Sequence, residues 1–169
     1  MDNSILLNYL SEYGLIFLFV IVLLEYLNLP GFPAGVILPL AGVWVANSRF
    51  SFILAIVVSV LAGLLGSWIL YWIGRAGGEI ILRKYIEKFP KQNDLIQKNM
   101  ELLRKRGNLG VFISKLLPMI RTIISIPAGV LKLDFISYTL YSALGIFIWN
   151  FAFIASGYYF GDAILNKIF

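Results

Sequence analysis

Residues 107–131 read GNLGVFISKLLPMIRTIISIPAGVL, an apolar stretch that is broken by charges and prolines. The interrupting residues are two cations and two prolines, namely Lys115, Pro118, Arg121 and Pro127. Broken backbone at membrane depth is tolerated only where protein buries it or where it lines a polar cavity. Ionisable side chains at that depth are costly and usually functional. The stretch therefore predicts half-helices around a polar site, an arrangement that is typical of transporters.

Residues 13–46 repeat this pattern nearer the N-terminus. One acid and three prolines interrupt this second apolar stretch, namely Glu25, Pro30, Pro33 and Pro39. Pro30 and Pro39 lie nine residues apart, as do Pro118 and Pro127, and the sequence Ala-Gly-Val follows each pair. We therefore expect two broken hairpins of the same kind.

Two long runs without a charged residue, Phe50–Ile73 and Phe135–Gly161, follow the broken stretches. About 20 apolar residues are enough to cross a bilayer as a helix. The chain has 169 residues, of which 60% are hydrophobic and 14% are charged, whereas a soluble domain is about 25% charged. These features predict an integral membrane protein rather than an unusually apolar soluble domain.

Further landmarks indicate that the chain contains an internal repeat. The first long run ends in a Tyr-x-x-Gly motif at Tyr71 and Gly74, and the second ends in the same motif at Tyr158 and Gly161. Aligning these landmarks and the proline pairs gives a period of about 85–88 residues. Because each unit would contain one spanning helix, consecutive units would point in opposite directions across the membrane. The alternative is chance similarity between two apolar segments.

The predicted fold is an all-α membrane protein with a single domain over residues 1–169. It is an inverted repeat, in which each unit is a proline-broken re-entrant helical hairpin plus one long transmembrane helix. Repeat one covers about 12–75 and repeat two about 107–162. Because two spanning helices and two hairpins bury little surface, we expect a homodimer.

Positive charge is concentrated between the two repeats. Nine of the 14 lysines and arginines lie between Arg75 and Arg106, and none lies before Arg49. The positive-inside rule predicts that residues 75–106 form a basic cytoplasmic helical loop, broken at Pro90, with both termini outside the plasma membrane. This clustering explains the net charge of +5 without a nucleic-acid partner. Two interpretations of the loop stay open. It is either a solvated helix face or a surface that binds lipid headgroups.

The broken tips would meet near the membrane midplane and bring Glu25 opposite Lys115 and Arg121. For Glu25 we expect proton coupling or pairing with Arg121. The alternative is an interfacial carboxylate that is hydrogen-bonded to the broken backbone. For Lys115 and Arg121 the alternative to a buried site is that they extend to the cytoplasmic interface.

The segment around Pro118 is the sharpest local signal for a binding site. Pro118 frees backbone carbonyls, Arg121 offers a planar fork that suits phosphate, and Lys115 adds a point charge. With Thr122 beside them, these residues predict a substrate site for an anion. No metal or cofactor is expected.

Small and aromatic residues on the long runs are expected to serve packing. Gly63 and Gly66 share a helix face with room for a neighbouring backbone, and Ser67 is grouped with them. Trp149 lies in the middle of its run and is expected to pack. The Gly74–Gly78 segment is interpreted as the stop of the first spanning helix.

Several classes of function are disfavoured by what the chain lacks. It contains no cysteine and no histidine, which removes disulfides, thiolate metal sites and histidine general bases. No catalytic motif is visible, so we expect no enzyme. The N-terminal segment also lacks the basic region of a cleavable signal peptide.

Three segments resemble the DedA family, which is also called the SNARE-associated or VTT-domain family. The first segment holds Glu25, Pro30, Pro33, Pro39 and Gly42; the second holds Gly63, Gly66, Tyr71, Gly74 and Arg75; the third holds Lys115, Pro118, Arg121, Thr122, Pro127 and Gly129. The resemblance covers about residues 12–162. Two positions depart from the family pattern, because Gly35 stands where many members carry a second acid and Lys115 where an arginine is usual. The chain also ends soon after the second long helix, where many members continue.

The resemblance implies a bacterial lipid transporter in the plasma membrane, with Lys115 and Arg121 on the lipid phosphate and Glu25 in proton coupling. The first hypothesis is a flippase for undecaprenyl phosphate. The second is a flippase or scramblase for phosphatidylethanolamine or another phospholipid, with Glu25 binding the ammonium of the headgroup. A small proton-coupled solute transporter and a membrane scaffold whose charges merely pair are the remaining alternatives.

Overall fold

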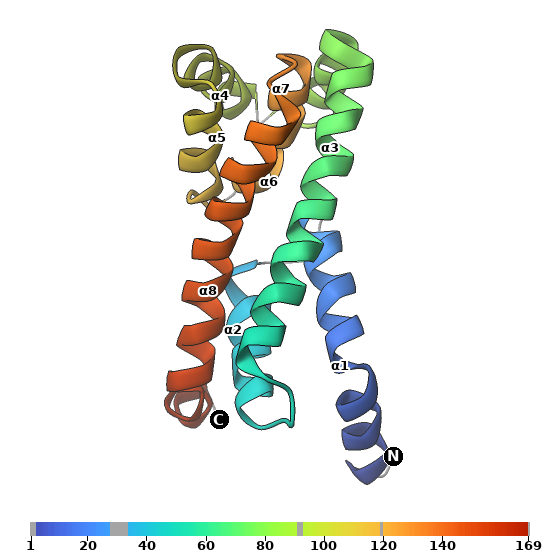
Figure 1. The fold of residues 1–169 in the computed structure, drawn as a ribbon, viewed down its shortest axis with the longest axis vertical. Coiled ribbons are helices and arrows are strands. Elements are labelled where there is room, and N and C mark those ends of the chain that lie inside the picture. The colour runs from blue at the N-terminus through green and yellow to red at the C-terminus, as the bar shows by residue number, and fades with distance from the viewer. Residues whose placement is uncertain (1–2, 28–33, 91–92, 119, 169) are drawn as a thin grey trace.

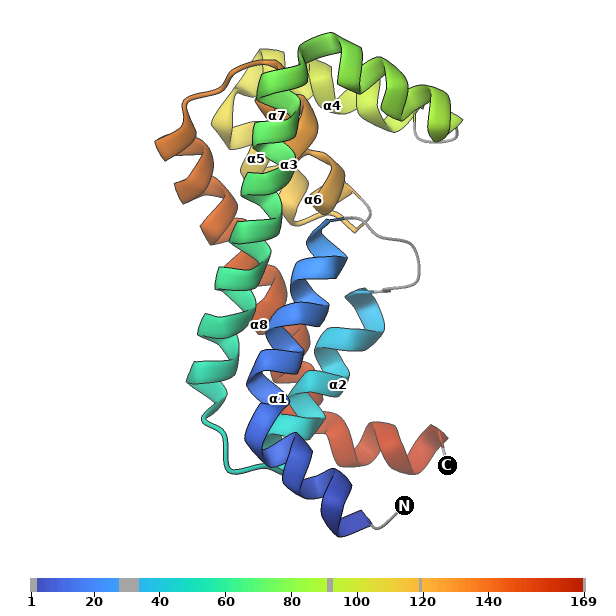
Figure 2. The same ribbon diagram turned by 90° about the vertical axis from the view of Figure 1, so that its right-hand side faces the viewer.

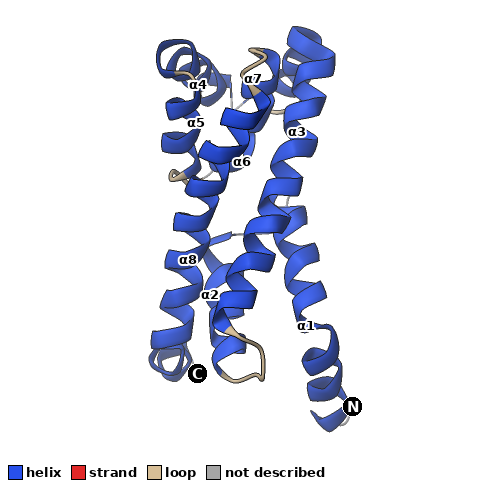
Figure 3. Ribbon diagram, viewed as in Figure 1, coloured by secondary structure: helices blue, strands red, loops and turns tan. Residues whose placement is uncertain are grey.

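The computed structural model describes residues 3–27, 34–90, 93–118 and 120–168. Within these ranges every regular element is a helix and no strand occurs (Figure 3), which confirms the all-α prediction. The predicted turn at Pro30 and Pro33 lies outside the described residues.

Two long helices, α3 (Phe52–Lys88) and α8 (Phe135–Ile168), run the length of the molecule (Figure 1). Their segments Phe52–Ile80 and Phe135–Gly161 are long and apolar enough to cross a membrane. They coincide closely with the two charge-free runs of the sequence, so these two elements are where the sequence predicted them.

The ends of the long helices follow local rules. Asp134 caps α8, since the Ser137 backbone N–H donates to Asp134 Oδ2 at 2.9 Å, and this hydrogen bond lowers the pKa of the Asp134 carboxyl. In α3 the helix passes straight through Gly74 and breaks only at Gly78, where φ is +53°. The remainder of α3 then lies across one end of the bundle (Figure 2). The stop predicted for the Gly74–Gly78 segment is therefore confirmed at its last residue, Gly78, whereas Gly74 itself is helical.

The first hairpin consists of α1 (Asn3–Tyr26) and α2 (Ala34–Ala46), which run antiparallel in the half of the molecule that holds both termini (Figure 2). Helix α1 ends near mid-length, and α2 starts there and runs back. Pro39 lies inside α2 without interrupting it, so the break predicted at this proline does not occur.

The second hairpin lies in the opposite half. It consists of α5 (Asn108–Lys115), which runs toward the middle, and of α6 (Ile120–Ile123) and α7 (Ser125–Val130), which run back (Figure 1). Pro127 lies within α7 and does not break it either, whereas Pro118 lies in the turn between α5 and α6.

The basic loop is more structured than a solvated helix. Helix α4 (Asn93–Arg106) follows the expected break at Pro90 and packs against the bundle. One of its faces is buried through Ile96, Asn99, Met100 and Leu103, while its basic last turn is exposed. The prediction of an exposed helix therefore holds for one face only.

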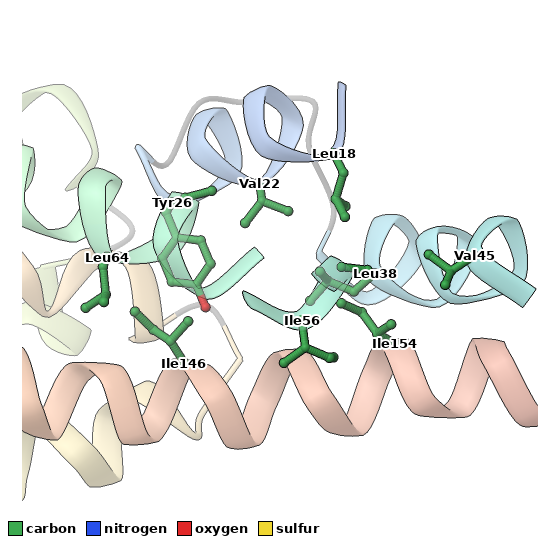
Figure 4. Close-up of a cluster of buried hydrophobic side chains, with 11 residues drawn as sticks. Leu18, Val22, Tyr26, Leu38, Val45, Ile56, Leu64, Ile146 and Ile154 are labelled. Carbon is green, nitrogen blue, oxygen red and sulfur yellow. The ribbon is translucent and has the colours of Figure 1, made fainter. Parts of the chain in front are cut away.

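The hairpins and the long helices pack in an exchanged pattern. Helix α1 packs on α3, but α2 packs mainly on α8; likewise α5 packs on α8, but α7 packs mainly on α3. Apolar side chains from α1, α2, α3 and α8 fill the core of the first half, among them Val22, Leu38, Ile56 and Ile154 (Figure 4).

Glycines allow these packed helices to approach with their backbones. A side chain at Gly74 would collide with the carbonyl oxygen of Ile126 on α7, and one at Gly129 would collide with that of Tyr71 on α3. On the other pair of helices, Gly157 lies against the carbonyl of Pro39 and Gly42 against that of Ile154. Close approach of this kind favours van der Waals packing between helices in lipid.

The backbone contacts indicate a different alignment of the two halves, which differs from the predicted one by one helical turn of α8. Gly157, rather than Gly161, takes the place on α8 that Gly74 takes on α3, since Gly161 instead contacts the side chain of Val43. The Tyr-x-x-Gly match at Tyr158 is therefore misaligned by four residues, although the glycines of the short helices do correspond. The inverted repeat and the re-entrant placement of the hairpins in a bilayer stay predictions.

Candidate functional site

Three ionisable side chains are buried where the two hairpins meet. Glu25 on α1 is 4% exposed, Arg121 on α6 is 2% exposed, and Lys115 at the end of α5 is fully buried. Lys115 and Arg121 do not extend to the protein surface, as the alternative for them required. The backbone that the alternative for Glu25 invokes, beyond the end of α1, lies outside the described residues. The folding of two segments that are about 90 residues apart thus creates one charged cluster inside an apolar bundle.

Glu25 and Arg121 form an ion pair between Glu25 Oε1 and Arg121 Nη2. The predicted pairing is therefore confirmed. Among the described residues, the other carboxylate oxygen, Oε2, has no hydrogen-bond donor although it is buried. The carboxylate consequently keeps one acceptor available for a proton or a second cationic group.

Aromatic rings enclose the guanidinium of Arg121. The Arg121 Cζ lies 4.7 Å from the centre of the Tyr26 ring and 4.9 Å from the centre of the Trp149 ring. Arg121 Nη1 also donates a hydrogen bond of 2.7 Å to the hydroxyl of Tyr26. Cation–π contacts and the ion pair fix the orientation of the guanidinium.

A chain of polar groups leads from Tyr26 across the bundle. The Tyr26 hydroxyl donates to Asn150 Oδ1 on α8 at 3.3 Å, and Asn150 Nδ2 donates to Ser59 Oγ on α3 at 3.2 Å. Ser59 in turn donates to the carbonyl of Ile56 at 2.8 Å. This chain connects the charged cluster to both long helices.

Lys115 is bound by hydroxyl groups rather than by an acid. Its Nζ donates to Ser67 Oγ at 2.8 Å and to Ser125 Oγ at 3.1 Å, and no carboxylate of the described residues pairs with it. Its aliphatic stem passes the backbone of Gly145, where an added Cβ would lie 2.5 Å from the Lys115 Cβ. A buried ammonium without a counterion favours an anionic ligand.

The other predicted site residues lie close by but differ in role. Thr122 is buried next to Arg121. Pro118 is exposed, and its carbonyl accepts a 2.8 Å hydrogen bond from Ile120 N–H, so it shapes the turn that presents Arg121 and does not line the cluster.

Several of the predicted structural residues have identifiable packing or hydrogen-bonding roles. Gly63 and Gly66 pack against Tyr26, as expected for close approach of α1 and α3. Arg75 donates to the Tyr71 hydroxyl at 2.5 Å, and that hydroxyl donates to the Leu133 carbonyl at 2.5 Å. These contacts tie α3 to the segment that precedes α8.

Sequence reasoning did not find several members of the cluster. Ser67 was expected to pack but accepts the Lys115 hydrogen bond, and Trp149 faces Arg121. Tyr26, Ser125 and Asn150 were not singled out. Asn150 did carry a usable signal, since an amide in the middle of a charge-free spanning run needs a buried partner.

The arrangement can bind an anion at an apolar site. With all three groups ionised, two cations face one carboxylate, so the cluster carries a net positive charge. An incoming phosphate could displace the carboxylate from Arg121 and take up the ammonium of Lys115 through charge-assisted hydrogen bonds. The cluster combines the planar guanidinium of Arg121 and the ammonium of Lys115 in a low-dielectric setting, where charge-assisted contacts to an anion are strong.

Comparison with known proteins gives a consistent result. The family model described as the VTT domain matches residues 32–159. The chain is 32% identical to Undecaprenyl phosphate transporter A of Staphylococcus aureus over 95% of this chain and 81% of that protein. It is 31% identical to the protein of the same name from Bacillus subtilis, over 77% of this chain and 66% of that protein.

A third relative is the Uncharacterized membrane protein YkoX of Bacillus subtilis, which is 33% identical over 80% of this chain and 62% of that protein. The chain thus spans less than two thirds of the two Bacillus relatives. No solved structure shows a significant match.

Proposed function

The chain belongs to the VTT-domain family of membrane proteins, the DedA family of its motifs, and on this premise we propose that it transports a lipid across the bacterial plasma membrane. The proposed substrate is undecaprenyl phosphate, and the protein acts as a flippase. Two of its relatives carry the name of an undecaprenyl phosphate transporter.

The observation that carries this proposal is the buried cluster of Glu25, Lys115 and Arg121. A lipid phosphate has the charge and the acceptor geometry that an arginine fork and a lysine recognise. The long helices on either side are apolar and lipid-compatible. A charged site within such a bundle suits a substrate whose head is anionic and whose body is hydrocarbon.

The transport path follows from placing the two hairpins as re-entrant elements of an inverted repeat. The hairpin tips carry Glu25 on one side and Arg121 on the other, so movement of one hairpin relative to its long helices would open the cluster to one leaflet. The exchanged packing of α2 on α8 and of α7 on α3 supports this placement.

Glu25 is the proposed coupling residue. Protonation of its carboxylate would break the ion pair and leave Arg121 free for the phosphate, while its deprotonation would compete the phosphate away. The unpartnered Oε2 is the oxygen available for the proton. The proposed action is transport and not catalysis, in keeping with the transporter names of the two relatives.

A second candidate function is transport of a zwitterionic phospholipid such as phosphatidylethanolamine. The free acceptor on Glu25 favours it, because an ammonium could bind there while the phosphate contacts Arg121. A proton-coupled solute transporter is the third alternative.

The test is lipid transport by the purified protein in proteoliposomes, with fluorescent polyprenyl phosphate or fluorescent phosphatidylethanolamine in separate vesicles. We expect movement of the polyprenyl phosphate and its loss in Arg121→Ala and Glu25→Gln. Arg104→Ala is the matched control, since Arg104 is exposed on α4. Movement of the phosphatidylethanolamine alone would select the second candidate. Proton flux without movement of either lipid would reject lipid transport in favour of solute transport.

A further inference from the structure

An apolar groove lies between α1 and α2 of the first hairpin. Its volume is about 260 Å³. The lining includes three residues of α1 and three of α2, namely Gly14, Leu18, Ile21, Ile37, Leu40 and Trp44. All of its lining residues are apolar, so the groove offers nothing to a polar group.

The groove opens sideways from the molecule. Leu18 forms its floor and is buried, whereas Phe17 and Leu40 at its rims are each more than half exposed. In a membrane protein these rims face lipid. A hydrocarbon chain can therefore enter from the side without passing through the bundle.

The two ends of the groove differ. At one end the Trp44 indole lies directly on the backbone of Gly14, where a side chain would collide with it. This contact closes the groove toward the end of the molecule that holds the termini. The other end lies at Ile21, one helical turn before Glu25.

Helical spacing places the charged cluster in line with the groove. Residues 14, 18, 21 and 25 follow one another at intervals of three or four, which puts them on a single stripe of α1. Glu25 is thus the next member of the stripe that lines the groove. The groove therefore leads along one face of α1, from its closed apolar end toward the ion pair of Glu25 and Arg121.

We propose that this groove holds the hydrocarbon tail of the lipid whose phosphate binds at Arg121 and Lys115. The inference rests on the proposed function and adds a tail site to the headgroup site. Head and tail of an amphiphile would then lie on consecutive turns of α1, with the rest of a long tail continuing into the bilayer. The groove selects for a long, flexible chain, while the cluster selects for the phosphate.

The size of the groove excludes a bulkier occupant. A helix from a second copy of the chain has a diameter of about 10–12 Å, so a groove of about 260 Å³ takes single side chains of such a helix and not the helix itself. Drug-sized ligands also occupy larger sites of about 300–1,000 Å³. A single chain of methylene or isoprene groups fits.

The first test is photo-crosslinking of the purified wild-type protein in nanodiscs with a polyprenyl phosphate that carries a diazirine in its tail. We expect adducts on residues 14–21 and 37–44, which excess unlabelled polyprenyl phosphate removes and which Arg121→Ala weakens. Adducts that are equally frequent on the lipid-facing sides of α3 and α8, or that resist competition, would mean bulk lipid contact only and would overturn the tail site.

The second test compares two leucines that are similarly exposed but lie at different places, one in the groove and one outside it. Leu40 lines the groove and is 53% exposed, whereas Leu61 on α3 is 52% exposed and lies outside it. We expect Leu40→Trp to slow transport of a long polyprenyl phosphate about tenfold, the effect of displacing about two methylene groups. Transport of geranyl phosphate should be unchanged, and Leu61→Trp should change neither. Equal effects of the two substitutions would contradict the proposal.

The two tests separate this inference from the proposed function. Competed adducts in the groove of a protein that moves no lipid would retain the tail site and reject transport. Active transport of polyprenyl phosphate without adducts in the groove would reject the tail site alone.

Discussion

Glu25 and Arg121 form a buried ion pair across two hairpins that enter the bundle from opposite ends of the molecule. Each side chain lies at the inner end of its hairpin, so the pair joins the two halves of the chain. A buried pair is costly to break because the remaining partner is left as an unpaired charge. The pair therefore makes the position of one hairpin depend on that of the other.

Removing one member of this pair should destabilise the protein more than removing both. Arg121→Ala leaves the Glu25 carboxylate unpaired, and we expect a loss of about 3–5 kcal/mol in the free energy of unfolding. The double variant Glu25→Gln/Arg121→Met should recover most of that stability but no transport. Thermal unfolding in detergent, followed by tryptophan fluorescence, measures this. A double variant as unstable as Arg121→Ala would show that the unpaired Glu25 carboxylate is not the cause of the loss.

Tyr26→Phe should impair transport more than it impairs folding. The variant loses the hydroxyl that accepts from Arg121 and donates to Asn150, at a cost of about 1–3 kcal/mol for hydrogen bonds that involve a charge. Its ring still covers the guanidinium. We expect transport about tenfold slower, measured in proteoliposomes. Tyr159→Phe is the control, because Tyr159 is largely exposed, and an equal effect there would argue against a specific role for Tyr26.

Lys115→Met should fold but bind the lipid phosphate weakly. Methionine has a similar length and removes an ammonium whose hydrogen-bond partners, within the described part of the chain, are Ser67 and Ser125. We expect an affinity for polyprenyl phosphate at least tenfold lower, measured by thermophoresis in detergent, with Lys98→Met on the exposed face of α4 unchanged. Lys115→Arg keeps the charge and should retain binding. Full affinity of Lys115→Met would remove this residue from the headgroup site.

The glycine contacts should tolerate no side chain. Gly74→Ala and Gly157→Ala each place a methyl group against a backbone carbonyl, and overpacking of this kind costs about 1–3 kcal/mol. We expect a lower midpoint of thermal unfolding for both. Gly35→Ala is the matched control, since nothing lies within 4 Å of an added Cβ there. If Gly157→Ala matched that control while Gly161→Ala did not, the one-turn shift in register would be wrong.

The predicted membrane orientation can be read by cysteine labelling, because the chain has no cysteine of its own. Asn47, which directly follows α2, and Gln97 on α4 are both exposed. Helices α2 and α4 lie toward opposite ends of the bundle (Figure 1). We expect an impermeant maleimide to label Asn47→Cys in intact cells and Gln97→Cys only after permeabilisation. The reverse result would invert the topology and the proposed direction of access.

The sequence predicted those parts of the structure that depend on composition and spacing. The long helices are visible as charge-free runs, and the pairing of Glu25 with Arg121 follows from the cost of leaving either charge alone in an apolar chain. The effect of prolines was less predictable. Pro39 and Pro127 lie inside helices. Pro127 is in the first turn of α7, where a proline is tolerated because the N–H would have no intrahelical partner, and Pro39 is tolerated in a helix that packs along α8.

The polar partners of the cluster were harder to predict because they are contributed by tertiary contacts. Ser67 and Asn150 come from the two long helices, and only the packing of both hairpins brings them to Lys115 and Tyr26. The register error has a similar cause. The Tyr-x-x-Gly letters recur at Tyr158, but the site of backbone contact on α8 is set by the geometry of α2, which selects Gly157.

The exchanged packing has a consequence for how the chain folds during its synthesis at the ribosome. Helix α2 finds its main surface on α8, so Gly42 must wait for Ile154 to be synthesised before its backbone contact can form. Contacts between residues so distant in sequence slow folding, and an incomplete chain exposes surfaces that invite misassembly. We therefore expect the first hairpin, with its acid, to need shielding by the insertion machinery or by lipid until the last helix has been made.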